Sequence, residues 1–238
     1  MSWENQPRDN KGRFLPKAVV PTKTKARTKK VSNKLTQVNV FVIDDSVSIS
    51  SNRMTDSIKE GMNKIIDDVI SENKDQMFWG LSMFGRYSNR HYAFSNSPLR
   101  LVTYNPRQNA TALYDGIGYA IQNTIEYIQK NKINRPSVVF NIFTDGEEND
   151  SKVYTKEKIN NLISQKRDEG WMINFIGGGD DEEVKKVAKD LGIFAGNTVS
   201  YNTNSADTTK VLDKVSKSMK SYSKSVKQGK TSNEGFFA

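Results

Sequence analysis

Residues 38–48 read Val38-Asn-Val-Phe-Val-Ile-Asp-Asp-Ser-Val-Ser48, and this stretch decides the fold of the chain. It opens with a short run of mostly apolar residues and closes with two aspartates and two serines. An apolar run of this length that ends in polar residues predicts a buried strand followed by a loop. We therefore place the start of the folded domain at residue 35.

Downstream of this strand, apolar residues at helical spacing alternate with further short apolar runs. Met54, Ile58, Met62, Ile65 and Val69 recur every three or four residues, which predicts an amphipathic helix over 54–71. The same reasoning predicts helices over 111–129, 155–168, 180–191 and 206–225, strands over 78–84, 137–143, 171–176 and about 194–200, and one or two short strands near 90–103. This alternation predicts an α/β fold with a mostly parallel sheet and helices on both faces.

The composition excludes several kinds of site. Cysteine is absent from the 238 residues, which excludes disulfides, thiolate metal sites and cysteine nucleophiles. His91 is the single histidine, so a zinc site or a Ser-His-Asp triad is hard to build. No run of about 18 apolar residues exists, and the first residues are polar where a signal peptide would be apolar. We expect a cytoplasmic protein that does not bind a membrane.

The net charge of +9 is concentrated at the two ends of the chain. Residues 1–34 carry ten Lys or Arg against two acidic residues, a net charge of +8, and residues 217–238 carry a net charge of +4. The segment between them has a net charge of −3. We therefore predict a basic arm over 1–34 that is disordered or ordered by a partner, a globular domain over 35–225 and a C-terminal tail over 226–238.

Three separate loops of the predicted sheet carry oxygen-bearing side chains. The first strand leads into Asp44, Ser46 and Ser48, the start of a helix brings Thr111, and the strand over 137–143 leads into Asp145. Ligands of an open parallel sheet bind outside the carboxyl ends of its strands, so we expect these residues to meet there. Two carboxylates with several hydroxyls suit Mg²⁺, which prefers oxygen ligands and keeps several waters. Mn²⁺ and Ca²⁺ are the alternatives.

The order Asp44-x-Ser46-x-Ser48, Thr111 and then Asp145 in Thr-Asp-Gly-Glu resembles the metal-ion-dependent adhesion site, or MIDAS, of von Willebrand factor A (vWA) domains. The resemblance spans roughly residues 36–225. It implies a Rossmann-like vWA fold with one short antiparallel edge strand. It also implies that the two serines and the threonine contact the metal, that the aspartates act largely through water, and that an Asp or Glu of a protein partner completes the metal's coordination.

Within that family, the segments around Thr144-Asp-Gly-Glu147 and Glu169-Gly-Trp171 are similar to a stand-alone group of bacteria and tailed phages. Asn109 and Val47 depart from it, because many relatives have glycine at those positions. The segment Arg8-Asp-Asn-Lys-Gly-Arg-Phe-Leu-Pro16 also resembles leader segments of phage and bacterial proteins. The resemblance implies the bacterial cytoplasm, or the host cytoplasm if the protein is encoded by a phage.

Several neighbouring residues have simpler interpretations than metal binding. Glu147, Glu148 and Asp150 are interpreted as a solvated acidic loop, with contacts to the site or to a partner as the alternative. Asp115 is interpreted as stabilising the positive end of its helix. Gly177-Gly-Gly179 could hold an anion, but four acidic residues follow it, so a strand-to-helix turn capped by Asp180 is favoured.

These observations lead to three hypotheses for function. The leading one is a Mg²⁺-dependent protein-interaction module, an adaptor without catalytic residues that captures a partner carboxylate. The second is nucleic-acid binding through the basic arm 1–34 and the basic C-terminal end, with the domain as a scaffold. The third is a Mg²⁺-dependent hydrolase, which is disfavoured because the motif supplies neither a general base nor a cation for a leaving group.

Overall fold

The computed structural model describes residues 34–86 and 91–237, so nearly all of the predicted basic arm lies outside the described residues. The described chain forms a six-stranded sheet in the order β3-β2-β1-β4-β5-β6. The strands are β1 (Thr36–Asp44), β2 (Phe78–Phe84), β3 (His91–Ser95), β4 (Pro136–Thr144), β5 (Met172–Gly178) and β6 (Thr198–Tyr201). All neighbouring pairs are parallel except β2 with β3. The predicted α/β fold with one antiparallel edge strand is confirmed.

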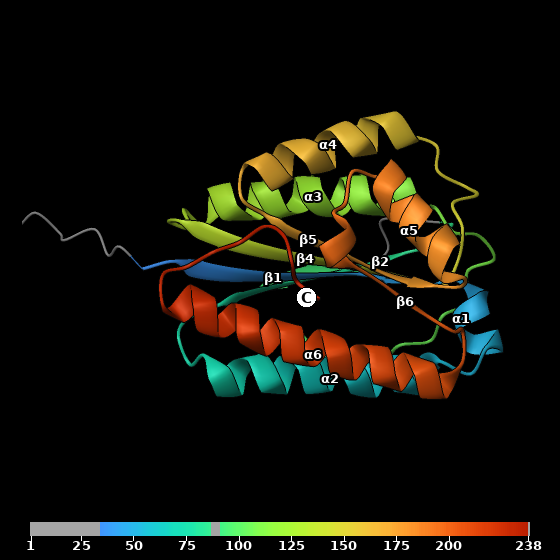
Figure 1. Ribbon diagram of the computed structural model, residues 1–238, viewed down its shortest axis with the longest axis horizontal. Helices are drawn as coiled ribbons and strands as arrows, with labels where there is room; N and C mark the ends of the chain where they lie inside the picture. Colours follow the sequence, from blue (N-terminus) through green and yellow to red (C-terminus); the bar gives the residue numbers. More distant parts are fainter. Residues whose placement is uncertain (1–33, 87–90, 238) are drawn as a thin grey trace, which may run out of the picture. The chain divides into compact units, whose positions relative to one another are not determined.

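Helices cover both faces of this sheet (Figure 1). Helices α2 (Thr55–Glu72) and α6 (Ser205–Lys227) lie on one face, and α3 (Leu113–Lys130), α4 (Lys156–Asp168) and α5 (Asp181–Asp190) lie on the other. The short helix α1 (Val47–Ser51) stands at the end of β1, and a 3₁₀ turn over Ala195–Asn197 precedes β6.

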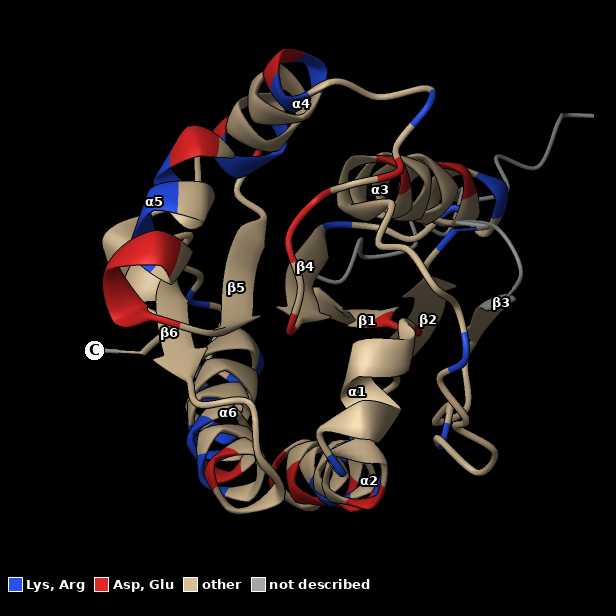
Figure 2. Cartoon of the chain, turned by 90° about the vertical axis from the view of Figure 1, so that its right-hand side faces the viewer, with Lys and Arg blue, Asp and Glu red and all other residues tan. Residues whose placement is uncertain are grey.

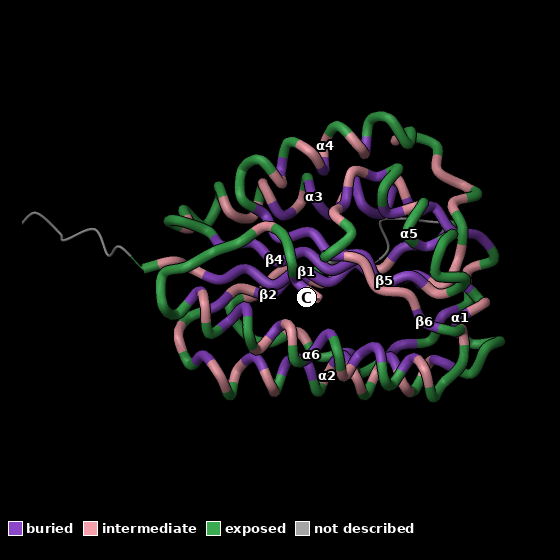
Figure 3. Tube along the Cα trace, in the orientation of Figure 1, coloured by how far each residue is buried: buried purple, intermediate pink, exposed green. Residues whose placement is uncertain are grey.

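The alternation of side chains along β1 divides the core into two layers. Val38, Val40 and Val42 point into the layer under α3, α4 and α5, whereas Phe41 and Ile43 point into the layer under α2 and α6. All five are buried, as are nearly all residues of β1, β4 and β5 (Figure 3). A strand with apolar side chains on both sides is stable here because both of its faces are covered.

The last residues of the chain pack back onto the domain. Phe236, within the segment that the sequence analysis sets apart as a tail, is only 6% exposed and contacts the ring of Tyr222. The side chain of Asn197 accepts a hydrogen bond from the Phe236 N–H (3.1 Å) and donates one to the Asn233 carbonyl (2.9 Å). Residues 228–237 therefore tie α6 to the 3₁₀ turn before β6.

The strand order creates the site at the carboxyl end of the sheet. From β1 the chain continues to β2 and β3 on one side and then crosses to β4 on the other. The helices that follow β1 and β4 lie on opposite faces, so their packing leaves a crevice at the ends of these two adjacent strands. Asp44 and Asp145 lie at those two strand ends.

Candidate functional site

The carboxyl edge of the sheet brings together the five residues that the sequence singles out: Asp44, Ser46, Ser48, Thr111 and Asp145, here called the oxygen cluster. Figure 2 views this edge and shows acidic residues in the loop after β4 and at the start of α5. The members come from the end of β1, the start of α1, the loop before α3 and the loop after β4.

Asp44 is the fully buried member of the oxygen cluster. Its Oδ1 accepts a hydrogen bond from the Ser46 N–H (2.8 Å), and its Oδ2 accepts one from Thr144 Oγ1 (2.6 Å). The hydroxyl of Tyr104 donates to the Asp44 carbonyl. Asp44 is therefore held in one orientation by the two strands that flank the crevice.

The two serines link Asp44 to Asp145. Ser46 stands at the N-cap position of α1, yet its side chain makes no capping hydrogen bond. Its Oγ lies 2.9 Å from Ser48 Oγ, which donates to Asp145 Oδ1 (2.8 Å). Helix capping thus does not explain this serine, whose hydroxyl faces its fellow members of the oxygen cluster.

Thr111 completes the oxygen cluster from the loop before α3. Its backbone N–H donates to Asn149 Oδ1 (2.9 Å), and its carbonyl accepts from the Asn149 N–H (3.0 Å). Thr111 Oγ1 has no hydrogen-bond partner in the described part of the chain. A Cβ placed on Gly146 would lie 3.2 Å from this Oγ1 and 3.9 Å from Asp44 Oδ2, so the glycine leaves the centre of the cluster open.

The two carboxylates of the oxygen cluster are costly to ionise without a cation. Burial raises the pKa of Asp44 to about 6, and Asp145 adds repulsion to that shift. Burial also raises the pKa of Asp145, although the hydrogen bonds from Ser48 and Asn52 oppose the shift. Two such carboxylates with three hydroxyls form a set of hard oxygen donors that fits a divalent cation. The described residues hold no group of three or more His, Cys, Asp or Glu placed to bind a metal, so a cation at the oxygen cluster would depend on the hydroxyls as well as on the two carboxylates.

Several residues that sequence reasoning missed position the oxygen cluster. Thr144 binds Asp44, Asn149 fixes Thr111, and Asn52 Nδ2 lies 3.5 Å from Asp145 Oδ2. Thr144 ends β4 next to Asp145 and Asn149 follows four residues later, but nothing in the sequence indicates that they contact Asp44 and Thr111. Asn52 follows α1, a five-residue helix too short for its periodicity to be recognised.

Two acidic residues near the site hold the loop after β4 in place. Glu148 accepts hydrogen bonds from the N–H groups of Tyr114, Asp150 and Ser151, at 2.7–2.9 Å, and from the Ser151 hydroxyl. The interpretation of Glu148 as part of a solvated loop is therefore wrong. Asp115, in the first turn of α3, is buried and accepts from the N–H groups of residues 152–154.

The glycine run 177–179 closes β5 and leads through Gly179 into α5, the predicted strand-to-helix turn. Asp180 caps α5 by accepting from the N–H groups of Glu182 and Glu183. A Cβ on Gly178 would lie 2.9 Å from Asp145 Cα, so glycine is needed for β5 to pass close to the oxygen cluster. Close packing therefore accounts for this glycine without an anion.

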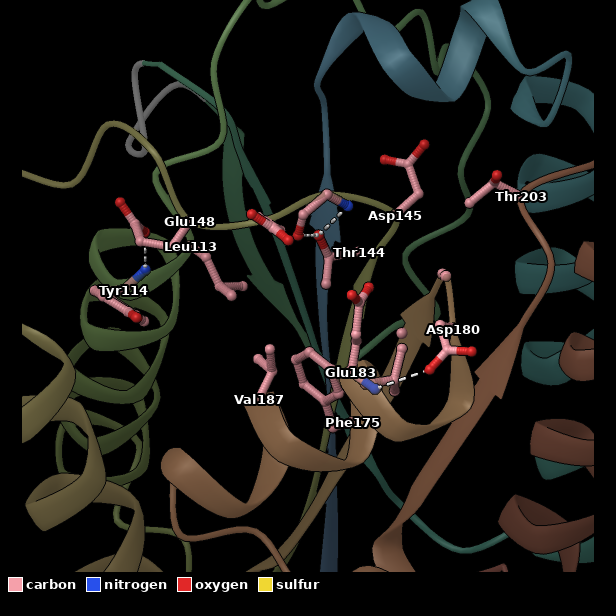
Figure 4. Close-up of a pocket in the computed structure, with 16 residues that line it drawn as sticks. Leu113, Tyr114, Thr144, Asp145, Glu148, Phe175, Asp180, Glu183, Val187 and Thr203 are labelled. Carbon is pink, nitrogen blue, oxygen red and sulfur yellow. Dashed lines mark hydrogen bonds between the residues drawn. The ribbon is translucent and has the colours of Figure 1, made fainter.

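A cleft of about 450 Å³ adjoins the oxygen cluster on the side of α3 and α5 (Figure 4). Thr144, Asp145 and Gly146 belong to both the cleft wall and the surroundings of the cluster. The remaining wall comes from the start of α3, the end of β5, the loop after β4 and α5.

Similarity to solved structures supports the same architecture. Proximal thread matrix protein 1 from the mussel byssus is 17% identical, with a TM-score of 0.54 over 75% of this chain and 46% of that one. The pilus adhesin SpaC from Lactobacillus rhamnosus GG is 13% identical, with a TM-score of 0.57 over 79% of this chain and 31% of that one. The vWF domain of the type V pili tip protein Mfa5 from Porphyromonas gingivalis is 9% identical, with a TM-score of 0.56 over 78% and 95%.

These identities show a shared fold alone, and the match covers less than half of the first two proteins. No curated protein matches the sequence. The family model of the von Willebrand factor type A domain matches residues 40–218, three quarters of the chain. The chain therefore belongs to the von Willebrand factor type A domain family.

Proposed function

We propose that this domain is a Mg²⁺-dependent protein-interaction module that captures an Asp or Glu side chain of a partner at a MIDAS. The observation that carries the proposal is the convergence of three distant segments on one open point. They bring the buried carboxylate of Asp44, the partly buried carboxylate of Asp145 and three hydroxyls together, and Gly146 leaves the space between them free.

The residues of the oxygen cluster divide into two roles in this proposal. The hydroxyls of Ser46, Ser48 and Thr111 would contact the cation, which supplies a positive centre that accepts an outside oxygen. Asp44 and Asp145 would offset its two charges and orient bound water. Five such groups do not fill an octahedral shell through direct contacts alone, so a partner carboxylate can complete it. Mn²⁺ and Ca²⁺ are alternatives with the same donor preference.

The comparisons favour binding over catalysis. Two of the similar structures are a pilus adhesin and a domain of a pilus tip protein. We carry over from them only an interaction role, and we propose no catalytic residue. Among the described helices, none is both long and apolar enough to span a membrane. The cytoplasm is our proposed location.

Affinity capture from bacterial lysate tests the proposal, followed by binding assays with the purified partner. Wild type should retain the partner in Mg²⁺ and release it in chelator, and Asp145→Ala should fail to retain it. Asp190→Ala is the matched control, because Asp190 is an exposed aspartate at the end of α5 that pairs with Lys156 (3.0 Å) and belongs neither to the oxygen cluster nor to the wall of the adjoining cleft. Replacing the Asp and Glu residues of the partner one at a time should identify one whose replacement weakens binding as much as removal of Mg²⁺ does. Undiminished binding by Asp145→Ala would refute the proposal.

A second candidate function, nucleic-acid binding, draws on the charge of the C-terminal half of α6 and the residues after it. Lys217, Lys224, Lys227 and Lys230 are exposed and make no ion pair with any described residue. Together with the basic arm 1–34 they could neutralise phosphates without reading sequence.

A further inference from the structure

We propose that the cleft beside the oxygen cluster receives an arginine side chain of the partner, next to the carboxylate that binds the metal. This inference rests on the proposed function, because it describes the partner of the same site. The partner's binding segment would then carry an acidic residue and an arginine close together.

The position of the cleft supports a shared ligand. Its wall includes Asp145, whose Oδ1 accepts from Ser48, and Gly146, which faces Thr111 Oγ1. A segment bound at the oxygen cluster therefore lies directly at the mouth of the cleft. Figure 4 shows Glu183 extending from α5 toward Thr144, across the space that such a segment would enter.

The floor of the cleft is apolar. Leu113, Phe175 and Val184 are buried, and Val187 and Tyr114 are partly exposed at its side. The aliphatic part of a long, charged side chain is stabilised when it covers such a surface, while the charged end stays in contact with water. A short acidic or hydroxylated side chain would leave this surface uncovered.

The rim of the cleft is negative, and among the described residues no Lys, Arg or His lines it. Of its five acidic residues, Glu148 and Asp180 are engaged by backbone N–H groups, and Asp145 belongs to the oxygen cluster. Glu147 and Glu183 are exposed, and neither side chain forms an ion pair or hydrogen bond with the described residues. The nearby Lys185 is already paired with Asp181 and Glu182. The described wall of the cleft therefore carries acidic side chains without a basic one, a lining that favours a cation over an anion.

Arginine fits these features better than lysine. Its planar guanidinium offers five N–H donors, which can reach carboxylates on two walls, and it stacks on aromatic rings such as that of Tyr114. Lysine presents a compact, strongly hydrated charge, which is less able to contact two separate carboxylates and an apolar wall at the same time.

The test is an NMR titration of the ¹⁵N-labelled full chain in chelator with N-acetyl-arginine N-methylamide. This probe has no carboxylate, so its binding does not depend on the metal. We expect saturable shifts of the amide signals of Gly177, Gly179 and Val187, and none with the citrulline analogue, which has the same length but no charge. Glu147→Gln combined with Glu183→Gln should weaken binding by about two- to fivefold, as expected for exposed ion pairs.

Glu182→Gln is the matched control, because Glu182 lies on α5 outside the cleft, and it should leave the affinity unchanged. Equal binding of citrulline, equal binding by the double variant, or shifts away from the cleft would overturn the inference. A Mg²⁺ titration of the same samples separates the two proposals. Failure to bind Mg²⁺ overturns the proposed function, whereas failure to bind arginine by a chain that binds Mg²⁺ overturns this inference alone.

Discussion

The substitution Asp44→Asn separates two effects of the oxygen cluster: the destabilisation of the metal-free protein by a buried carboxylate, and the binding of a cation. Asn keeps the acceptor for the Ser46 N–H, and its amide can donate to Thr144 Oγ1, which can in turn donate to the Gly146 carbonyl at 3.2 Å. The local hydrogen bonds therefore survive. What the substitution removes is a buried negative charge that makes ligation of a cation favourable.

The magnitude follows from the pKa of Asp44, which burial raises from 3.8 to about 6. A shift of about two units corresponds to about 3 kcal/mol by which the ionised carboxylate destabilises the folded state at neutral pH. Without metal, Asp44→Asn should thus raise the free energy of unfolding by up to about 3 kcal/mol, or the melting temperature by roughly 6–12 °C. Mg²⁺ at one hundred times its Kd should add about 2.7 kcal/mol to wild type and nothing to the variant.

The pH dependence has a definite sign. A carboxyl group whose folded pKa is raised contributes stability that is fully present below its unfolded pKa and is lost as pH rises through the folded pKa. Metal-free wild type should therefore lose this contribution between pH 4 and about 6, and Asp44→Asn should lack that component.

Thermal unfolding followed by circular dichroism, in chelator and in Mg²⁺, measures all of these quantities. Asp190→Asn is the control for removal of an exposed aspartate. The reasoning is refuted if Asp44→Asn is less stable than wild type in chelator, or if Mg²⁺ stabilises both proteins equally.

Four further predictions concern the surroundings of the site and the two ends of the chain. Gly178→Ala should weaken Mg²⁺ binding in calorimetry, because the new Cβ would lie 2.9 Å from Asp145 Cα and displace it. Phe236→Ala should lower the free energy of unfolding in urea by about 3–5 kcal/mol, since this ring is buried against α6. Burial raises the pKa of Tyr222 to about 12, so the free energy of unfolding should fall as pH rises from 10 to 12. Tyr222→Phe should reduce that fall in thermal unfolding at alkaline pH. Deletion of residues 1–33 should remove most nucleic-acid affinity and flatten its salt dependence in fluorescence anisotropy, and unchanged binding would exclude the arm.

The sheet could be predicted from sequence because its strands are apolar on both faces. Val38 to Ile43 and Ser137 to Phe143 have no solvent-exposed side, so each is a mostly apolar stretch without alternating polar positions. β6 is harder to recognise, since its four residues Thr-Val-Ser-Tyr are mostly only partly buried at the sheet edge. The single strand β3 occupies only part of the region where one or two strands were expected.

The oxygen cluster was predicted from residue order along three loops, and the structure brings all five residues together. Their role as metal ligands remains a prediction. The residues that position the oxygen cluster could not be identified from the sequence, because their contacts with it join segments that are far apart in the chain. The hydrogen bond from Thr144 to Asp44 spans 100 residues, and the single hydrogen bond from the Tyr114 N–H in α3 to Glu148 depends on how the loop after β4 folds back. The packing of Phe236 likewise requires the chain to fold back after α6, which no periodic pattern in the sequence predicts.

The most direct test of the metal site is a titration of the ¹⁵N-labelled chain with Mn²⁺, whose paramagnetism broadens amide signals near the ion. The account predicts saturable broadening of residues 44–48, 111 and 145–146, reversed by excess Mg²⁺ and absent in Asp145→Ala. Broadening centred elsewhere, for example at the acidic start of α5, or unchanged broadening in Asp145→Ala, would contradict it.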